Sequence, residues 1–528
     1  MRNFENTPRE KGEIGARITW MGQRFAAKVE GRAVSSLSGQ DSFRLDGSYV
    51  GMAVGNWMLS LGYPERWWGP GWDGSLILST NARPAPQISI NRNLSIPFES
   101  RWLSWIGQWS LTSFMSQLDD NRSIEVGTGG VYFGTAGAAV SIWDHETRKH
   151  RPSNLLDIYD TARLIDTLEH VHFHGRTLVA RDMVDSHDLD VNTAYAISMG
   201  TSKPVGSSFF QPEHVDEAVD MFDVMLGREG AFAERPFLMG HNTFVVPPLR
   251  FAEDAARCMV AQVRRDMPIK MVSAGQAGAT SPAALAGSLA QGLAECLAAL
   301  TCVNLLKPGH PCVIALWPFV SDLRTGAMSG GSGEEAVIHA ASAQVTNWLG
   351  LPSGVAAGMT DSKLPDNQAG YEKGLTVALA GHAGSNLVYE SAGMLASLLA
   401  CSFEALVIDN DMLGAVNRSV RGIEVTPETL SAQVIHEVVH GPGHFLGHDQ
   451  TLAMMQTEYL YPEVGDRLNP DNWYDDGSRS VDERAREQVQ QVLSTHFPSH
   501  VPPEVDAIVR ERFDIYLPVE ELTASSRW

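Results

Sequence analysis

Short apolar runs alternate with longer amphipathic segments between about residue 170 and residue 410. The short runs have the length of buried strands, and the longer segments repeat apolar residues with the period of a helix. Eight runs are predicted as strands: His172–Val179, Lys203–Ser208, Pro236–Gly240, Ile269–Ser273, Cys312–Leu316, Gly354–Gly358, Asn386–Glu390 and Ala405–Asp409. The predicted helices are Leu155–Glu169, Glu213–Leu226, Arg250–Asp266, Pro282–Leu306, Glu334–Leu349, Gln368–Ala380 and Ser391–Ser402.

This alternation predicts an α/β fold in which crossover helices join parallel strands. Eight such strands close into a (βα)8 barrel of the TIM type. A doubly wound open sheet is the alternative, but it would want a glycine-rich fingerprint after its first strand, and none is present there. We therefore predict an N-terminal region over residues 1–150, a barrel over 151–425 and a helical C-terminal extension over 426–528.

The N-terminal region has a different character from the barrel segment. No sustained helical or strand period is visible between about residues 37 and 121, so we expect an irregular subdomain there. An insertion, or a stretch of altered reading frame, is the alternative. Near the other end, a charged helix is expected over Ser480–Leu493. The atypical segment contains seven of the thirteen tryptophans: Trp57, Trp67, Trp68, Trp72, Trp102, Trp105 and Trp109.

Composition narrows the class of protein. A hydrophobic content of 44% is typical of a soluble globular protein, and a formal net charge of −22 disfavours nucleic acid as a partner, because such binding needs a basic surface. The first residues contain no apolar signal segment, and the apolar runs are interrupted short of a membrane span. Five cysteines without a CxxC pair indicate free thiols in a reducing compartment. We expect a cytoplasmic homo-oligomer without membrane association.

A histidine-rich stretch, HEVVHGPGHFLGH, contains the HExxH signature of zinc proteases. On a helix, His436 and His440 would face the same side one turn apart, with Glu437 as general base. Glu458 or Glu463 would have to supply the third ligand. A zinc metallopeptidase is therefore the alternative function.

Several features weigh against that alternative. The extended form of the signature requires a histidine where Leu446 stands, and the stretch follows the last predicted strand. The local pattern alone would allow the zinc helix, since the pair Thr426-Pro427 is typical of a helix start and the Gly441–Gly443 turn ends the helix after His440. We favour an ordinary helix end and predict no metal site.

Motifs along the barrel segment carry more information. In order, the most informative are GQAGATSPAALAG (275–287), KPGHPC (307–312), DLRTGAMSGGSGEE (322–335), GMTDSKLPDNQAGYEKG (358–374), NLVYESAGMLAS (386–397), FEALVIDNDMLG (403–414) and HGPGHFLGHDQTL (440–452). Together they resemble the trimethylamine methyltransferase family, in particular its branch without pyrrolysine, which includes glycine betaine methyltransferases. The resemblance extends from about Gly129 to Trp473 and is weak before Gly129. It assigns the second half of the histidine-rich stretch to a turn typical of the family.

The resemblance implies a barrel enzyme that removes a methyl group from an N-methylated amine. The methyl group would pass to the Co(I) centre of a separate corrinoid protein, so the cobalamin belongs to this partner and no tightly bound cofactor is expected. Attack on a quaternary ammonium expels a neutral tertiary amine, which needs no proton. Quaternary amines such as glycine betaine or proline betaine are therefore the expected substrates.

The site of such a barrel should lie just beyond the carboxyl ends of its strands. Aromatic faces and a carboxylate would suit a cationic substrate. The predicted catalytic residues are Glu390, Asp361 and His241. The predicted substrate-binding residues are Trp317, Tyr389, Gln276, Thr360, Lys363 and Asp322. Core packing of the aromatic residues and a solvated loop around Asp361 and Lys363 are the structural alternatives.

Overall fold

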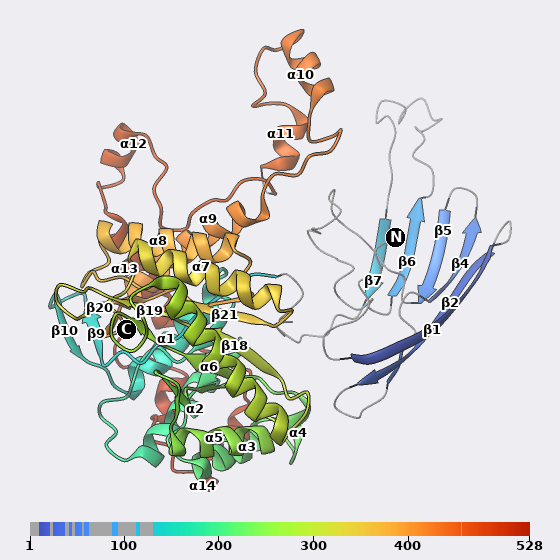
Figure 1. Ribbon diagram of the computed structural model, residues 1–528. Helices are drawn as coiled ribbons and strands as arrows, with labels where there is room; N and C mark the ends of the chain where they lie inside the picture. The colour runs from blue at the N-terminus through green and yellow to red at the C-terminus, as the bar shows by residue number, and fades with distance from the viewer. Residues whose placement is uncertain are drawn as a thin grey trace. The chain divides into compact units, whose positions relative to one another are not determined.

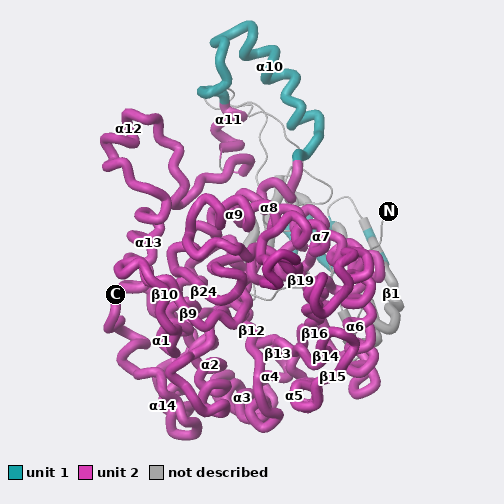
Figure 2. The backbone as a smooth tube through the Cα atoms, turned by 60° about the vertical axis from the view of Figure 1, so that its left-hand side comes forward, with its two compact units in different colours: residues 1–121, 423–448 teal, residues 122–422, 449–528 magenta. Residues whose placement is uncertain are grey.

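Two compact units make up the computed structural model. The first contains residues 1–121 and 423–448, and the second contains residues 122–422 and 449–528 (Figure 2). The structure describes residues 10–21, 25–36, 42–44, 48–54, 57–62, 87–92, 112–116, 130–455 and 457–528.

The second unit is built on a closed barrel of eight parallel strands (Figure 1). Strands β16, β18 and β21 are buried almost throughout, since one face points into the barrel and the other packs on helices. The predicted TIM-type barrel is therefore confirmed. In spatial order the strands are β11 (Phe173–Gly175), β12 (Val205–Ser207), β13 (Leu238–Asn242), β16 (Ile269–Ser273), β18 (Cys312–Leu316), β21 (Ser353–Ala356), β22 (Leu387–Tyr389) and β8 (Tyr132–Thr135).

Helices connect successive strands of the barrel, and polar side chains cap several of them. Asp185, Ser332, Asp366 and Ser402 accept hydrogen bonds from backbone N–H groups in the first turns of α2, α7, α8 and α9. The helices are α1 (Leu155–Thr167), α2 (Ser186–Gly200), α3 (Pro212–Met225), α4 (Ala231–Glu234), α5 (Glu253–Arg264), α6 (Leu285–Leu306), α7 (Gly333–Trp348), α8 (Asn367–His382) and α9 (Phe403–Arg421).

One predicted strand, Ala405–Asp409, is wrong, because this run belongs to helix α9. Its apolar residues continue with helical spacing, and Leu406 and Leu413 are both fully buried. The barrel is closed instead by β8, which comes first in the chain and pairs with both β11 and β22. The barrel thus begins at Tyr132, before the predicted boundary at residue 151.

The predicted helix Ser391–Ser402 is also wrong. This segment forms the hairpin β23 (Met394–Leu395) and β24 (Ala400–Cys401), which joins a small sheet with β9 (Ser141–Asp144) and β10 (Lys149–Pro152). Its turn has three consecutive non-glycine residues with φ of 51°, 53° and 72°, a left-handed conformation that side chains disfavour. Tertiary hydrogen bonds hold it there: the N–H groups of Ala396 and Ser397 donate to the Ser362 and Thr360 carbonyl oxygens.

Further short strands lie in the loops between barrel strands and the helices that follow them. The hairpin of β14 (Val245–Val246) and β15 (Arg250–Phe251) precedes α5. A three-stranded sheet contains β17 (Gln276–Ala277), β19 (Phe319–Ser321) and β20 (Met328–Ser329). These loops are at the carboxyl ends of the strands, where barrel enzymes carry their sites.

Among the described residues, α6 is the one helix long and apolar enough, by length and composition, to cross a membrane. In the fold it packs against β16 and β18. Its buried residues recur at helical spacing and include Glu295, which accepts a hydrogen bond from the Ser273 hydroxyl at 2.5 Å. Its apolar face thus contacts the barrel.

The C-terminal extension is helical, as predicted. It contains α11 (Asp449–Met454), α12 (Pro470–Asp475), α13 (Val481–Thr495), α14 (Pro503–Arg512) and a 3₁₀ turn at Val519–Leu522. Helix α13 begins with a capping box and packs on α9 and α1. Its buried residues are Ala485, Val489 and Leu493, one turn apart.

The first unit contains an antiparallel sheet and the short helix α10 (Ala432–Val439). The sheet contradicts the expected irregular subdomain: alternate residues such as Val50 and Met52 are exposed while Gly51 is buried, a period of two that the glycines and serines obscure. Of the tryptophans in the atypical segment, Trp57 is in β5, and the other six lie outside the described residues. The strands are β1 (Glu10–Met21), β2 (Phe25–Ser36), β3 (Ser42–Arg44), β4 (Tyr49–Val54), β5 (Trp57–Gly62), β6 (Gln87–Arg92) and β7 (Thr112–Ser116).

Candidate functional site

A cavity of about 300 Å³ lies at the carboxyl ends of the barrel strands. Its size suits a small ligand. Residues of seven barrel strands or of the loops after them contribute to its wall. Small residues line one part, and the charged, imidazole and aromatic groups on its lining are Arg176, His241, Lys270, Glu390, Trp317 and Phe319.

Lys270 is the charged residue of strand β16, and only 2% of it is exposed. Its ammonium nitrogen lies 3.7 Å from the centre of the Tyr389 ring and 4.7 Å from that of Trp317. Burial lowers the pKa of Lys270 to about 7, although the nearby Glu390 carboxylate opposes this change. The aromatic faces predicted for a substrate cation thus already contact an ammonium group of the protein.

Glu390 follows β22 directly and lines the cavity. One of its carboxyl oxygens is buried without a hydrogen-bond partner in the described part of the chain. Burial raises its pKa to about 8, and Lys270 acts in the opposite direction. Its φ of 58° is rare for a residue with a side chain, and backbone strain of this kind often accompanies function. The strained backbone directs an unpaired carboxyl group to the cavity wall.

His241 and Trp317 form the neighbouring part of the wall. Their ring centroids are 5.3 Å apart and the rings are perpendicular. Burial, together with the charges of Lys270 and Arg176, lowers the pKa of His241 well below its usual range, so the imidazole is neutral at pH 7. The indole N–H of Trp317 is buried without a hydrogen-bond partner among the described residues. Both rings can therefore offer hydrogen bonds to a ligand.

Two charged residues of the cavity were missed by the sequence prediction, Lys270 and Arg176. Both lie within predicted strands, whereas the predicted site residues lie at the last positions of strands or in the loops after them. Strand β11 ends at Gly175, so Arg176 is in fact the first residue after it. Lys270 could have been recognised as the one charged residue of a mainly apolar predicted strand. Burial of a charge costs free energy unless another group pairs with it, so such a residue is a candidate for the site.

Asp361 and Thr360, which were predicted to act on the substrate, are not on the cavity wall. Asp361 accepts hydrogen bonds from the Ser329 hydroxyl at 2.9 Å, the Gly330 N–H at 2.7 Å and the Ser397 hydroxyl. The Thr360 hydroxyl donates to a Glu372 carboxyl oxygen at 2.5 Å. These contacts tie together the loops that follow β20, β21 and β23.

We expect Asp361→Asn to loosen the left-handed turn that contains Leu398, a residue of the cavity wall. The amide nitrogen of asparagine would face a hydrogen-bond donor, at a cost of roughly 1–3 kcal/mol. Denaturant unfolding measures this loss, and proteolysis of the 394–401 hairpin reports its mobility. Asp475→Asn, an exposed site on α12, is the control. Unchanged stability and protection would contradict the positioning role.

The remaining predicted residues are also outside the cavity wall. Tyr389 packs edge-on against Phe173 inside the barrel, with ring centroids 4.9 Å apart. Lys363 is exposed and donates to the Asp361 carbonyl oxygen at 2.6 Å. Gln276 is in β17, and its backbone N–H donates to the Thr280 hydroxyl at 2.9 Å.

Asp322 has a local role in its own loop. It pairs with Arg324 at 2.8 Å, and the hydrogen bonds from that guanidinium lower the pKa of its carboxyl to about 2. Of the nine predicted residues, the structure therefore brings Glu390, His241 and Trp317 to the cavity.

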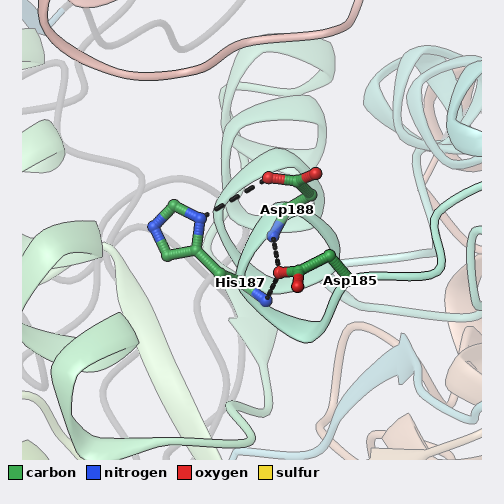
Figure 3. Close-up of side chains that lie close together, drawn as sticks. All are labelled: Asp185, His187 and Asp188. Atoms are coloured by element: carbon green, nitrogen blue, oxygen red, sulfur yellow. Dashed lines mark hydrogen bonds and ion pairs between the residues drawn. The ribbon is translucent and has the colours of Figure 1, made fainter.

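One group of potential metal ligands occurs in the described ranges: Asp185, His187 and Asp188 (Figure 3). Asp185 accepts hydrogen bonds from the backbone N–H groups of His187 and Asp188, which makes it the N-cap of α2. Nε2 of His187 lies 2.6 Å from a Glu217 carboxyl oxygen. The capping and pairing contacts account for this cluster without a metal.

The HExxH residues lie on α10, which begins at Ala432 and not at Pro427 as predicted. The ring centroids of His436 and His440 are 4.3 Å apart with the ring planes tilted by 37°, and Nδ1 of His440 lies 2.9 Å from the His436 carbonyl oxygen. Glu458, the proposed third ligand, forms ion pairs with Arg418 and Arg421. The geometry is that of a helix end with its carbonyl groups satisfied.

We therefore expect His440→Ala to leave the metal content of the purified protein unchanged. Zinc held by a peptidase site would depend on this ligand. Replacement of a histidine that only caps the helix would instead lower the free energy of unfolding by at most about 1 kcal/mol. Metal analysis by mass spectrometry, run beside denaturant unfolding, makes the comparison. Stoichiometric zinc that disappears in the variant would overturn this assignment.

Comparisons with known proteins match the chain to two families, one at its N-terminal end and one over its larger part. Residues 1–133 match the capsule assembly protein Wzi family. A solved structure of Wzi, an outer membrane protein involved in group 1 capsule assembly in Escherichia coli, is 28% identical over 22% of this chain and 28% of that one, with a TM-score of 0.19. The match to a family of its own disfavours a stretch of altered reading frame.

The barrel also resembles solved structures at low identity. A dihydropteroate synthase from Xanthomonas albilineans is 12% identical, covers 57% of this chain and 97% of that one, and has a TM-score of 0.35. 

The larger part of the chain matches a different family. Residues 92–514 match the trimethylamine methyltransferase (MTTB) family. Trimethylamine methyltransferase MttB of Desulfitobacterium hafniense is 31% identical over 76% of this chain and 79% of that protein. MttB2 of Methanosarcina mazei is 32% identical over 73% and 77% of the two chains, and a glycine betaine methyltransferase of D. hafniense is 28% identical over 73% and 80%. With this match over most of its length, the chain belongs to the trimethylamine methyltransferase family, whose named relatives are methyltransferases.

Proposed function

We propose that the protein removes a methyl group from a quaternary or tertiary methylated amine, such as glycine betaine, and transfers it to the Co(I) centre of a separate corrinoid protein. The observation that carries this proposal is the cavity at the carboxyl ends of the barrel strands, which combines aromatic rings with an unpaired carboxyl group. The named relatives, trimethylamine and glycine betaine methyltransferases, support a methylated amine as substrate. The corrinoid would supply the nucleophile that accepts the methyl group.

The chain's own residues would bind and orient the amine. Glu390 lines the cavity and can balance a substrate cation, and the Trp317 and Phe319 rings exclude water on their side of it. Departure of a neutral tertiary amine requires no proton donor, which agrees with a neutral His241. Alignment of one N-methyl group toward the open end of the barrel is the remaining requirement.

The test is methyl transfer in a reconstituted mixture. The purified protein is incubated with a reduced corrinoid protein and a panel of glycine betaine, proline betaine, trimethylamine and tetramethylammonium. The cobalt absorption spectrum should lose its Co(I) features with at least one amine, and the demethylated amine should appear in equal amount. No change with any amine would refute the proposal.

We extend the proposal to a homo-oligomer in the cytoplasm. The five free cysteines, three of them buried, support a reducing compartment. Light scattering during gel filtration tests the oligomeric state, and a monomeric mass would refute that part.

A further inference from the structure

The charges around the cavity do not balance. Arg176 and Lys270 supply two cationic groups, whereas Glu390 is the one carboxylate on the wall among the described residues. The Lys270 ammonium already has its neighbours, the two aromatic rings and the Glu390 carboxyl group. Arg176 is the cation left over.

The guanidinium group of Arg176 has no hydrogen bond or ion pair within the described part of the chain, although it is partly buried. The carboxylate that influences it from a distance, Asp190, is occupied elsewhere. One Asp190 oxygen lies 2.7 Å from Nδ1 of His214 and accepts the Phe210 N–H at 2.6 Å. A guanidinium has five donors in a planar fork, and an unpaired one in a cavity is costly unless a ligand binds it.

Small residues form the wall beside Arg176, in a cavity of about 300 Å³. Gly175 and Gly206 have no side chains, and Ser207 and Ser208 follow on the same wall. The Arg176 backbone is fixed, because its N–H donates to the Gly206 carbonyl oxygen at 2.9 Å. A planar carboxylate could therefore approach the guanidinium fork in the bidentate geometry that arginine favours.

We propose that Arg176 binds an acid group of the substrate, so that the cavity selects N-methylated amino acids over methylated amines without an acid group. This inference rests on the proposed function and names its substrate class. The carboxylate would pair with Arg176, and the methylated nitrogen would lie toward Glu390 and Trp317. An amine without an acid group leaves the guanidinium unpaired, and this difference produces the selectivity.

The test measures binding without any corrinoid protein, by calorimetry with glycine betaine and with tetramethylammonium. Arg176→Gln should weaken glycine betaine binding roughly 10- to 100-fold, the cost of a lost charge-assisted hydrogen-bond pair. Arg176→Lys should give an intermediate loss, because an ammonium lacks the fork. Tetramethylammonium should bind Arg176→Lys as it binds the wild type, and it should bind Arg176→Gln no more weakly, because removal of a cation from the wall does not weaken the binding of another cation. Arg181→Gln, an exposed arginine nearby in the chain, is the matched control and should change neither affinity.

Three results would overturn the inference: unchanged glycine betaine affinity in Arg176→Gln, an equal loss for both ligands, or wild-type protein that does not bind glycine betaine. Circular dichroism of each variant identifies a folding defect. If Arg176→Gln does not fold, the affinities of Arg176→Lys are compared with those of the wild type instead. Selective binding without any cobalt change would refute the proposed methyl transfer and leave the role of Arg176 standing. Methyl transfer that Arg176→Gln does not alter, for acids and plain amines alike, would refute the role alone.

Discussion

Glu390→Gln is expected to lower methyl transfer about 100-fold or more. The change removes the single carboxylate of the described cavity wall and leaves Lys270 without its opposing charge. A buried ammonium left without its opposing charge costs about 3–5 kcal/mol, which corresponds to roughly 10²- to 4 × 10³-fold in an equilibrium constant. The measurement is kcat/KM with glycine betaine and a corrinoid protein, with Glu334→Gln, an exposed glutamate on α7, as the control. Activity within a factor of three of wild type would contradict the role.

The same carboxyl group predicts a pH dependence. Since the pKa of Glu390 is raised to about 8, the carboxyl becomes negative as the pH rises through that value. The pKa of Lys270 is lowered to about 7, so the ammonium loses its charge as the pH rises. Both changes make the cavity more negative, and a quaternary ammonium carries no proton of its own. The affinity for tetramethylammonium should therefore increase between pH 6 and pH 9.

Calorimetry at intervals of half a pH unit would record this increase. Glu390→Gln should remove the increase in tetramethylammonium affinity above pH 7.5 and leave the increase at lower pH that is due to Lys270. An affinity that is flat with pH in the wild type would contradict both assignments.

Lys373→Ala is expected to destabilise the barrel by about 3–5 kcal/mol, because it leaves a buried carboxylate without its partner. The Lys373 ammonium lies 2.6 Å from Asp409, and the two side chains are 1% and 7% exposed. Asp409 also accepts the Gly393 N–H at 2.8 Å, so this ion pair joins α8 and α9 to the loop after β22. Burial raises the pKa of Asp409, and the nearby Lys373 opposes this shift.

Denaturant unfolding of Lys373→Ala, a double variant and a control variant distinguishes the loss of a buried ion pair from the loss of an exposed one. The double variant Lys373→Met with Asp409→Leu should recover most of the stability, since it leaves no buried charge. Arg257→Ala, which breaks an ion pair whose side chains are more than half exposed, should cost less than about 1 kcal/mol. A loss in Lys373→Ala as small as that in Arg257→Ala would show that the pair does not stabilise the fold.

The candidate site was predictable only in part. Glu390 and Trp317 directly follow barrel strands, and His241 is near the end of one, so the rule that barrel sites lie at strand ends located all three. Asp361 was placed in the correct loop, but its hydrogen bonds hold that loop and do not face the cavity. Its position in the chain does not tell which groups donate hydrogen bonds to the Asp361 carboxylate.

The sequence by itself determined the class of fold and the family. Strands β16 and β18 agree with the prediction residue for residue, because a short, mainly apolar run between helical repeats is a local signal. The family motifs are equally local, since each is a short run of letters in order.

Only the tertiary structure decided how the barrel closes and which charges meet. Tyr132 donates its N–H to the Asn386 carbonyl oxygen at 2.9 Å, a contact between segments that are remote in the chain. The Lys270 ammonium likewise contacts the ring of Tyr389, which belongs to another strand far away in the chain. The left-handed turn at Ala396–Leu398 exists because the loop after β21 accepts its N–H groups. Local periodicity contains no information about such distant partners, and for this reason the strand at the start of the barrel and the two missed cations emerged only from the fold.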